Sequence, residues 1–150
     1  MRYITVLLAV LTLAACGGKT PVANTAPEPH TAGDIATAMS MGKVTVWTAE
    51  TDPNKLLGRP GGYTSAATIV DKTLTCTEVA TDCGATVEVY PTDAEAKARS
   101  EYIQSMLGNG GVFGTEYHYF AGTALLRVTG QLAPDVAKQY AGKFEAAVNK

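Results

Sequence analysis

The chain has 150 residues, of which 46% are hydrophobic and 17% are charged, and its formal net charge is −2 at pH 7. This length favours one domain, and the composition suffices for one modest core and differs from that of disordered chains and coiled coils. The 12 basic residues form no cluster. The chain therefore lacks the positive face that nucleic-acid binding requires, and no nucleic-acid partner is expected.

The N-terminus has the pattern of an export signal. An apolar run from Ile4 to Leu13 comes after the positive charge of Arg2, and it is too short to span a bilayer as a helix. It predicts a signal peptide over residues 1–15.

The signal ends in Leu13-Ala14-Ala15-Cys16-Gly17, which resembles the lipobox of bacterial lipoproteins. The resemblance implies that the signal is cut before Cys16 and that Cys16 carries the lipid. Two or three acyl chains give stable membrane attachment. The expected location is thus the extracytoplasmic face of a cell membrane, with the membrane itself as a partner through the lipid anchor. An ordinary secretory signal with an incidental cysteine and an uncleaved transmembrane anchor are the alternatives.

A tether separates this anchor from the folded part. Residues 17–32 are rich in proline and glycine and hold almost no large apolar side chain, so they cannot compensate the entropy lost on ordering. We expect a lipidated cysteine and flexible tether over 16–32 and a single domain over 33–150.

The two remaining cysteines, Cys76 and Cys83, form an even pair in a chain that is expected to be exported. Export implies an oxidising compartment, so the pair predicts a disulfide. Two free thiols or a metal-binding pair are the alternatives. A metal site would need more cysteine or histidine than this part of the chain offers.

The first half of the domain shows strand patterns separated by turn residues. Asp34 is placed to cap a short helix that reaches Met41, and Asp52-Pro53 with Gly58 has the signature of a one-turn helix. Residues 71–84 hold the disulfide loop. Strands are expected at Lys43–Thr48, Tyr63–Val70 and Ala85–Tyr90.

The second half alternates helix and hairpin. Thr92 and Glu95 form a capping box that starts a helix reaching about Leu107, and the glycine-rich residues 108–111 end it. Two strands, Glu116–Phe120 and Thr123–Thr129, flank a predicted turn at Ala121-Gly122. Pro134 starts the last helix. Core-facing positions are Ala96, Ser100, Ile103 and Leu107 in the first helix and Val136, Tyr140, Phe144, Ala147 and Val148 in the last.

This order of elements predicts an α+β fold. We expect a two-layer sandwich with a largely antiparallel sheet and the two main helices packed on one face. Several segments are similar to an uncharacterised family of small exported bacterial lipoproteins. The resemblance implies one exported domain and supplies no catalytic residue. The segments are Thr51–Ser65, Val87–Tyr90, Ala98–Gln104, Glu116–Tyr119 and Leu125–Val128.

The sequence shows no convincing catalytic, cofactor or metal site. His30 lies in the tether, and His118 would need a serine and an acid from elsewhere in the chain, since no Gly-x-Ser-x-Gly elbow is present. Asp52 and Asn54 begin like a calcium loop, but the later ligands are missing. Four carboxylates near strand ends could work as an acid–base pair, although such residues are usually caps or solvated: Asp52, Asp71, Glu88 and Glu116.

Two groups of residues are candidates for binding. Arg59 and Tyr63 lie in a loop between glycine-rich turns, and arginine and aromatic side chains are favoured at binding hot spots. The plainer alternative is a rigid connection in which Leu56 and Leu57 fill the core and Arg59 pairs with a carboxylate. The second candidate surface is the strand segment Tyr117, His118 and Tyr119, whose side chains alternate between the two faces.

These features favour a non-enzymatic, membrane-anchored binding or interaction module. Its partner would be an envelope protein, a peptide or a wall component, and no cofactor is expected. One alternative is an inhibitor of an exported hydrolase that uses the loop of residues 54–63 or the ring of residues 76–83, held stiff so that binding loses little entropy. A small-molecule carrier or sensor subunit, and an enzyme, are the others.

Overall fold

The computed structural model of the chain describes residues 30–108 and 114–150. The predicted signal peptide, the predicted lipidation site Cys16 and nearly all of the predicted tether lie outside the described residues. Within the described part, five strands form one antiparallel sheet in the order β1-β2-β3-β5-β4. The strands are β1 (Lys43–Val46), β2 (Ser65–Val70), β3 (Gly84–Val89), β4 (Glu116–Ala121) and β5 (Ala124–Thr129).

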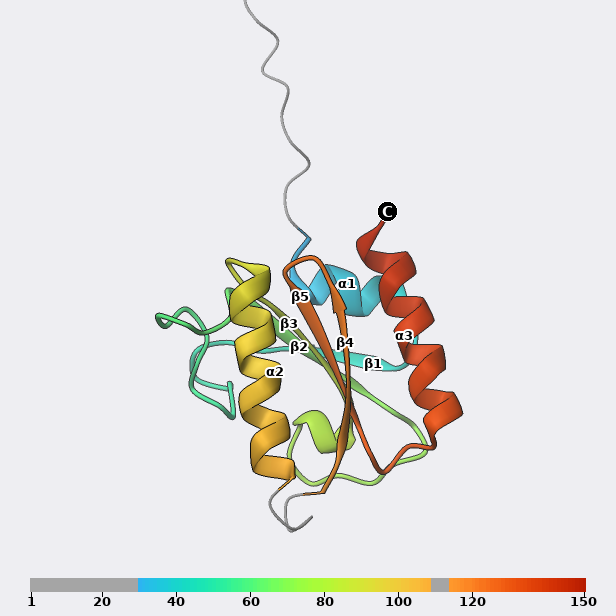
Figure 1. The fold of residues 1–150 in the computed structure, drawn as a ribbon. Coiled ribbons are helices and arrows are strands. Elements are labelled where there is room, and N and C mark those ends of the chain that lie inside the picture. Colours follow the sequence, from blue (N-terminus) through green and yellow to red (C-terminus); the bar gives the residue numbers. More distant parts are fainter. Residues whose placement is uncertain (1–29, 109–113) are drawn as a thin grey trace, which may run out of the picture.

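The helices lie on both sides of this sheet (Figure 1). The predicted α+β class and antiparallel sheet are confirmed, and all five strands were predicted to within two residues at each end. The placement of the main helices on one face is wrong, because α1 and α3 pack on one face and α2 packs on the other. The helices are α1 (Ala32–Met39), α2 (Asp93–Leu107) and α3 (Pro134–Val148), with a 3₁₀ turn η1 (Thr81–Cys83).

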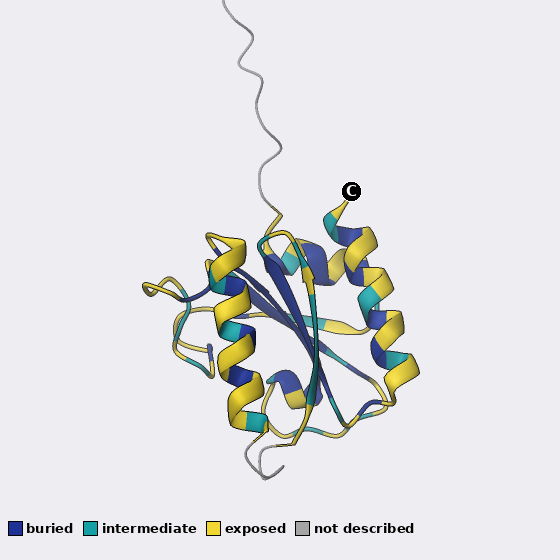
Figure 2. Ribbon diagram, viewed as in Figure 1, coloured by how far each residue is buried: buried dark blue, intermediate teal, exposed yellow. Residues whose placement is uncertain are grey.

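The central strands explain why both faces are covered. Every residue of β3 and β5 is buried, so each strand needs a layer on either side. Alternate residues of β5, among them Leu126, join the main core under α1 and α3, whereas Leu125 joins a second core under α2. Figure 2 shows α2 and α3 each turning its buried side toward the sheet between them.

The two cores differ in size and character. The main core is aliphatic and holds Tyr140 and Phe144 of α3, as the predicted apolar stripe requires. The second core is smaller and richer in aromatic rings, and Leu56 and Leu57 pack at its border. Its fully or nearly buried members are Trp47, Tyr63, Ala66, Tyr90, Ala96 and Leu125.

The helix starts are determined by capping. Thr92 caps α2 by accepting from the Glu95 backbone N–H, as predicted, and Pro134 occupies the first turn of α3. The prediction that Asp34 caps α1 is wrong. Thr31 is the N-cap, and Asp34 is the third helical residue, whose side chain bonds back to the Thr31 N–H. The helix therefore begins earlier than predicted.

Two connections between strands differ in how they are closed. The β4–β5 turn consists of Gly122 and Thr123, one residue later than predicted, because Ala121 pairs with Ala124 and Gly122 adopts φ +56°. The connection between β2 and β3 is closed covalently. The predicted disulfide is confirmed, since Cys76 and Cys83 are bonded within this loop.

One end of the molecule gathers the chain's first described residue and its last helical turn. A small cavity there is lined by His30, Gly122 and Val148 among others, and Figure 1 shows the C-terminus at the same end as the start of α1. Across the described ranges, no helix is long and apolar enough to cross a bilayer.

Candidate functional site

A buried ionic cluster lies between the sheet and α2. Strands β3, β5 and β4 place Glu88, Arg127 and Glu116 on the face that α2 covers. Arg127 Nη1 donates to Glu88 Oε1 at 2.8 Å, while Nε and Nη2 donate to the two oxygens of Glu116, also at 2.8 Å. The planar fork of arginine suits such a bidentate contact. Arg127 thus joins the outer strand to the centre of the sheet.

The cluster holds Glu116 in the charged form. Burial raises the pKa of Glu116, but hydrogen bonds from His118 and Arg127, together with their charges, lower it to about 2. Tyr90 donates its hydroxyl hydrogen to Glu88 Oε2 at 2.7 Å, and burial beside the Glu88 charge raises the pKa of Tyr90. Glu88 is fully buried, and its two oxygens accept from Tyr90 and Arg127.

The cluster continues through His118 to α2. His118 Nε2 lies 3.0 Å from Glu116 Oε2, and its Nδ1 lies 2.6 Å from Ser100 Oγ. Because a carboxylate only accepts, Nε2 carries a proton, and the Ser100 hydroxyl donates to Nδ1 when the ring is neutral. Serine, histidine and acid therefore stand in the order that nucleophilic catalysis uses, although the two ring nitrogens are exchanged relative to serine proteases.

The surroundings give this chain of hydrogen bonds a structural role. Ser100 is 7% exposed and lies in the middle of α2, and the His118 side chain is 5% exposed. Backbone N–H groups inside a helix are already bonded, so none near Ser100 is free to stabilise an oxyanion. The serine and the acid that His118 lacked in the sequence analysis are therefore present as Ser100 and Glu116, and the Ser100–His118 hydrogen bond connects α2 to β4.

A groove opens beside the cluster, between α2 and the loop after Asp52. Its volume is about 610 Å³. A second hollow of about 350 Å³ shares Leu56, Arg99 and Tyr102 with it and extends it along the helix. We call the two together the α2 groove. Its wider part is lined by Asn54, Leu56, Arg99, Tyr102, Ile103, Met106, Leu107, Glu116 and Arg127.

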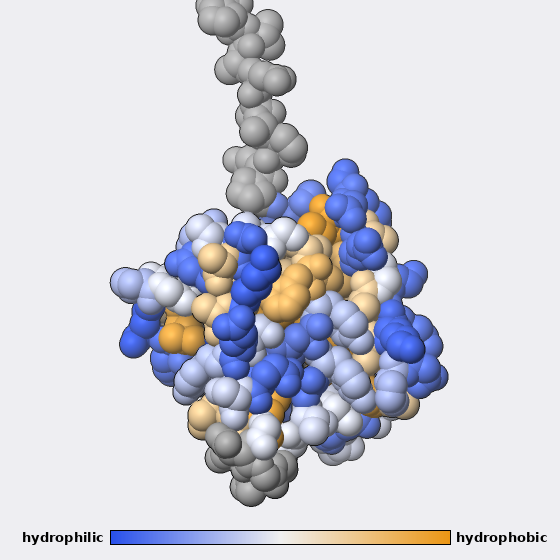
Figure 3. Space-filling view, viewed as in Figure 1, coloured by the Kyte–Doolittle hydropathy of each residue, from blue (hydrophilic) through white to orange (hydrophobic). Residues whose placement is uncertain are grey.

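Figure 3 shows the surface near this groove: apolar patches lie on both sides of the polar ridge formed by α2. The wall that α2 supplies includes Ile103, Met106 and Leu107, and the ion pair of Glu116 and Arg127 lines the same hollow. Apolar walls with a few convergent polar groups are typical of small-ligand sites.

Arg99 is the polar side chain of the groove with unused donors. Its side chain is 13% exposed, and its Nε is buried with no hydrogen-bond partner in the described structure. The nearest carboxylate oxygen, Glu88 Oε2, is 3.9 Å away, beyond hydrogen-bond distance. The guanidinium lies 5.8 Å from the centre of the Tyr102 ring one helical turn later, which fixes its position by a cation–π contact.

The opposite wall of the groove is a loop organised by Asp52. Its Oδ2 accepts from the backbone N–H groups of Leu56 and Leu57 at 2.7 and 2.9 Å, and its Oδ1 accepts from Asn54 N at 2.8 Å. Burial raises the pKa of Asp52, but these bonds and one from Tyr63 lower it below its ordinary value overall. The predicted one-turn helix is absent, because Lys55 adopts φ +55° and turns the chain off a helical path.

The structure separates the predicted binding pair of this loop. Tyr63 is fully buried, its ring packs between Trp47 and Tyr90, and its hydroxyl donates to Asp52 at 2.5 Å. It is a core residue and has no surface to offer a partner. Arg59 is exposed, and the described residues give it no ion pair, so the expected pairing with a carboxylate is not found. Leu56 and Leu57 do pack against the second core.

The second predicted surface is also largely covered. Tyr117 and Tyr119 are half-buried against the main core, and His118 is held in the ionic cluster. The exposed aromatic of this strand is Phe120, at 45%. The reason is that α2 and α3 flank β4 on its two faces, which the sequence order of the elements did not indicate.

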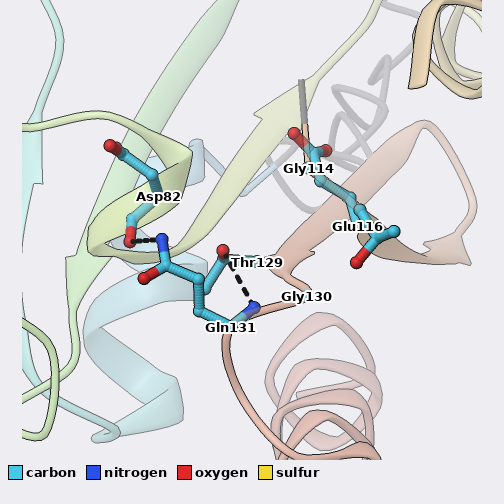
Figure 4. A pocket seen from close by; sticks show the side chains of 7 residues that line it. Asp82, Gly114, Glu116, Thr129, Gly130 and Gln131 are labelled. Atoms are coloured by element: carbon cyan, nitrogen blue, oxygen red, sulfur yellow. Dashed lines mark hydrogen bonds between the residues drawn. The ribbon is translucent and has the colours of Figure 1, made fainter. Parts of the chain in front are cut away.

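A smaller cavity of about 250 Å³ lies where β4 begins (Figure 4). Asp82 and Gln131 lie on one side and Glu116 lies across from them. Gln131 Nε2 donates to Asp82 O at 3.4 Å, and the Gln131 backbone N–H donates to Thr129 Oγ1 at 3.4 Å. These polar groups are used within the protein, so the α2 groove is the better candidate site.

The remaining carboxylates have structural partners. Asp71 accepts from Thr73 and from the Tyr140 hydroxyl, which ties the loop after β2 to α3. Of the four carboxylates considered as catalytic, Glu88 and Glu116 come together, and both bind Arg127. No group of three or more histidine, cysteine, aspartate or glutamate side chains in the described part could hold a metal ion.

Sequence reasoning missed Arg99 and Arg127 as site residues. Strand alternation does place Glu116 and His118 on one face, and the helical pattern places Ser100 toward the core. The contact of His118 with Ser100 could therefore have been predicted. The carboxylates nearest to these arginines, Glu88 and Glu116, lie on elements that are distant in the sequence.

Comparison with known protein families, with curated proteins and with solved structures finds no match for this chain.

Proposed function

We propose that the protein is a lipid-anchored, extracytoplasmic binding module without catalytic activity that takes its ligand in the α2 groove. The predicted anchor at Cys16 and the tether support the location. The observation that carries the binding role is the groove itself, about 610 Å³ in volume, with apolar and polar side chains on its walls and the Arg99 Nε donor without a hydrogen bond. The Asp52 hydrogen bonds hold one wall in place, so binding orders little additional chain.

A fragment screen by NMR tests this proposal. Amide signals of the mature chain are followed while a library of small apolar and amphipathic compounds is added. We expect binders to shift the amides of Leu56 and of residues 99–107. The variant Met106→Trp, which fills the groove, abolishes these shifts, and Gln139→Trp on the exposed side of α3 leaves them unchanged. Shifts that map elsewhere, or that survive Met106→Trp, contradict the proposal.

An inhibitor of an exported hydrolase is the second candidate. It is favoured by Val79, a large apolar residue that is 39% exposed inside the disulfide-closed ring of residues 76–83. An exposed, covalently closed loop loses little freedom on binding. The test is whether the protein slows envelope hydrolases in a purified panel and whether Val79→Asp removes that effect while the fold persists. Unchanged hydrolase rates contradict this role.

A further inference from the structure

We infer that the ligand of the α2 groove carries a single carboxylate, which Arg99 binds, joined to an apolar group that lies against Ile103 and Met106. This inference rests on the proposed function and names the chemical class of its ligand. Its basis is the contrast between the hydrogen bonds of the two arginines beside the groove.

Arg127 and Arg99 differ in how their donors are used. Arg127 bonds both Glu88 and Glu116 through three nitrogens. Arg99 makes no hydrogen bond to any described residue, and its Nε is buried. Glu88 Oε2, the nearest carboxylate oxygen, lies 3.9 Å from Arg99 Nε and accepts from Tyr90 at 2.7 Å. A buried guanidinium nitrogen without a hydrogen-bond partner is costly, and an acceptor brought by a ligand reduces that cost.

Charge favours a carboxylate as this acceptor. The guanidinium fork matches the two oxygens of a carboxylate in a bidentate contact. Phosphate fits less well, because it carries up to two negative charges and would lie near the carboxylates of Glu88 and Glu116. The charge of Glu116 is offset, since Arg127 and His118 bind both of its oxygens. A ligand with one negative charge therefore meets less repulsion from these carboxylates than a ligand with two.

The apolar part of the ligand is indicated by the rest of the wall. Ile103 and Met106 lie one and two helical turns beyond Arg99 on the same side of α2, and both line the groove. Met106 is also partly exposed, and a flexible thioether adapts to varied apolar shapes. A fatty acid and the C-terminal end of an apolar peptide share this chemistry.

Matched acid and amide probes test the inference on the mature chain. The probes are octanoate and octanamide, and N-acetyl-Leu-Leu as free acid and as amide, each titrated by NMR. We expect each acid to bind at least about tenfold more tightly than its amide, as a charge-assisted pair predicts. Arg99→Gln removes this preference, Arg99→Lys keeps part of it, and Lys97→Gln, an equal charge change on the exposed side of α2, leaves it intact.

The outcomes separate this inference from the function on which it rests. A preference for octanoate alone identifies a fatty acid, and a preference for the free peptide acid alone identifies a peptide end. Equal binding of acid and amide that Met106→Trp abolishes would leave the groove as the binding site and overturn the role of Arg99. Absence of binding by all four probes at millimolar concentration also overturns the inference, and the fragment screen then judges the groove separately. The fluorescence of Trp47 reports whether the Arg99 and Lys97 variants fold, and the dispersion of the amide spectrum reports the same for Met106→Trp, which adds a second tryptophan.

Discussion

At the scale of single residues, Arg127 is the side chain on which the α2 face of the sheet depends. It bonds the carboxylates of two strands, and one of these is fully buried. A buried ion pair adds little stability relative to an apolar replacement, but removing one partner is costly because a buried charge is left without compensation. Substitutions within this cluster should therefore have large effects.

Glu116 gives the cluster a defined response to acid. Its pKa in the folded protein is about 2, below the ordinary value of 4.5, so the stability it contributes is fully present above about pH 4.5 and is lost as the pH falls toward 2. Glu116→Gln should lower the free energy of unfolding at pH 7 by about 3–5 kcal/mol and flatten its decline over that pH window. Urea unfolding followed by Trp47 fluorescence measures both.

Glu101→Gln is the control for this prediction, because Glu101 is exposed on α2. It should keep the unfolding free energy and the acid dependence of the native chain. If Glu116→Gln shows the same decline between pH 4.5 and pH 2 as the native chain, the Glu116 ion pair does not set the acid response.

Ser100 should behave as a structural residue. Ser100→Ala leaves His118 Nδ1 without its 2.6 Å partner and should cost about 1–3 kcal/mol of unfolding free energy. A fluorophosphonate probe, which labels activated serines, should not modify Ser100. Mass analysis of the labelled chain checks this point, and an adduct on the peptide that contains Ser100 would show that the serine is reactive.

At the scale of elements, the loop of residues 52–63 depends on one carboxylate. Asp52→Ala removes the acceptor of three backbone N–H groups and of the Tyr63 hydroxyl. Hydrogen bonds to a charged group contribute about 1.5–3 kcal/mol each, though not additively, so a loss of about 3 kcal/mol is expected. Amide exchange at Leu56 and Leu57 should accelerate with it.

Asp135→Ala on the first turn of α3 is the comparison, since this exposed aspartate contributes only through the helix dipole and should cost less than about 1 kcal/mol. Equal losses in the two variants, or unchanged exchange at Leu56 in Asp52→Ala, would show that the loop is held by its apolar contacts instead.

The disulfide closes a second loop, the connection between β2 and β3, by a covalent bond. Replacing both Cys76 and Cys83 by alanine should lower the free energy of unfolding by roughly 2–3 kcal/mol, the loop-closure value for so short a ring. Exchange rates of the α2 amides should stay the same, because the ring lies between β2 and β3. Chemical unfolding of the double variant and of the oxidised chain provides the comparison, and equal midpoints would contradict the expectation.

Elements were predictable where one local signal decided them. Thr92 with Glu95, Pro134, and the alternation in β3 each indicate an element by neighbouring residues alone. The face on which α2 packs was not predictable in this way. Its buried residues Ala96 and Ser100 are small and adjoin a polar cluster, so its pattern resembles a weakly amphipathic helix. The side it occupies depends on distant strands.

The candidate site was less predictable than the fold for the same reason. Arg59 and Tyr63 look like a binding pair in sequence, but the Tyr63 hydroxyl donates to buried Asp52, so Tyr63 lies in the core. Arg99 Nε lacks a hydrogen bond because the nearest oxygen of Glu88, on another element, lies 3.9 Å away and accepts from Tyr90. Such competition for acceptors depends on tertiary contacts that a local pattern does not encode.

At the scale of the whole molecule, membrane attachment is the property to test. Cys16→Ser cannot form the thioether that the lipobox resemblance implies, so we expect the chain to move from the membrane fraction to the soluble extracytoplasmic fraction or to remain unprocessed. Cell fractionation with mass analysis of the N-terminus measures this. The Cys76 and Cys83 double variant should stay membrane-bound. Unchanged attachment of Cys16→Ser would contradict the lipoprotein prediction.

The shared position of the first described residue and the last turn of α3 has a practical consequence for experiments with tagged protein. A reporter domain fused after Lys150 would sit at the end of the molecule where the first described residue, His30, lies. In an anchored chain it would compete for the space next to the bilayer. An epitope inserted at the exposed residues Thr77 and Glu78, within the disulfide loop, avoids that crowding.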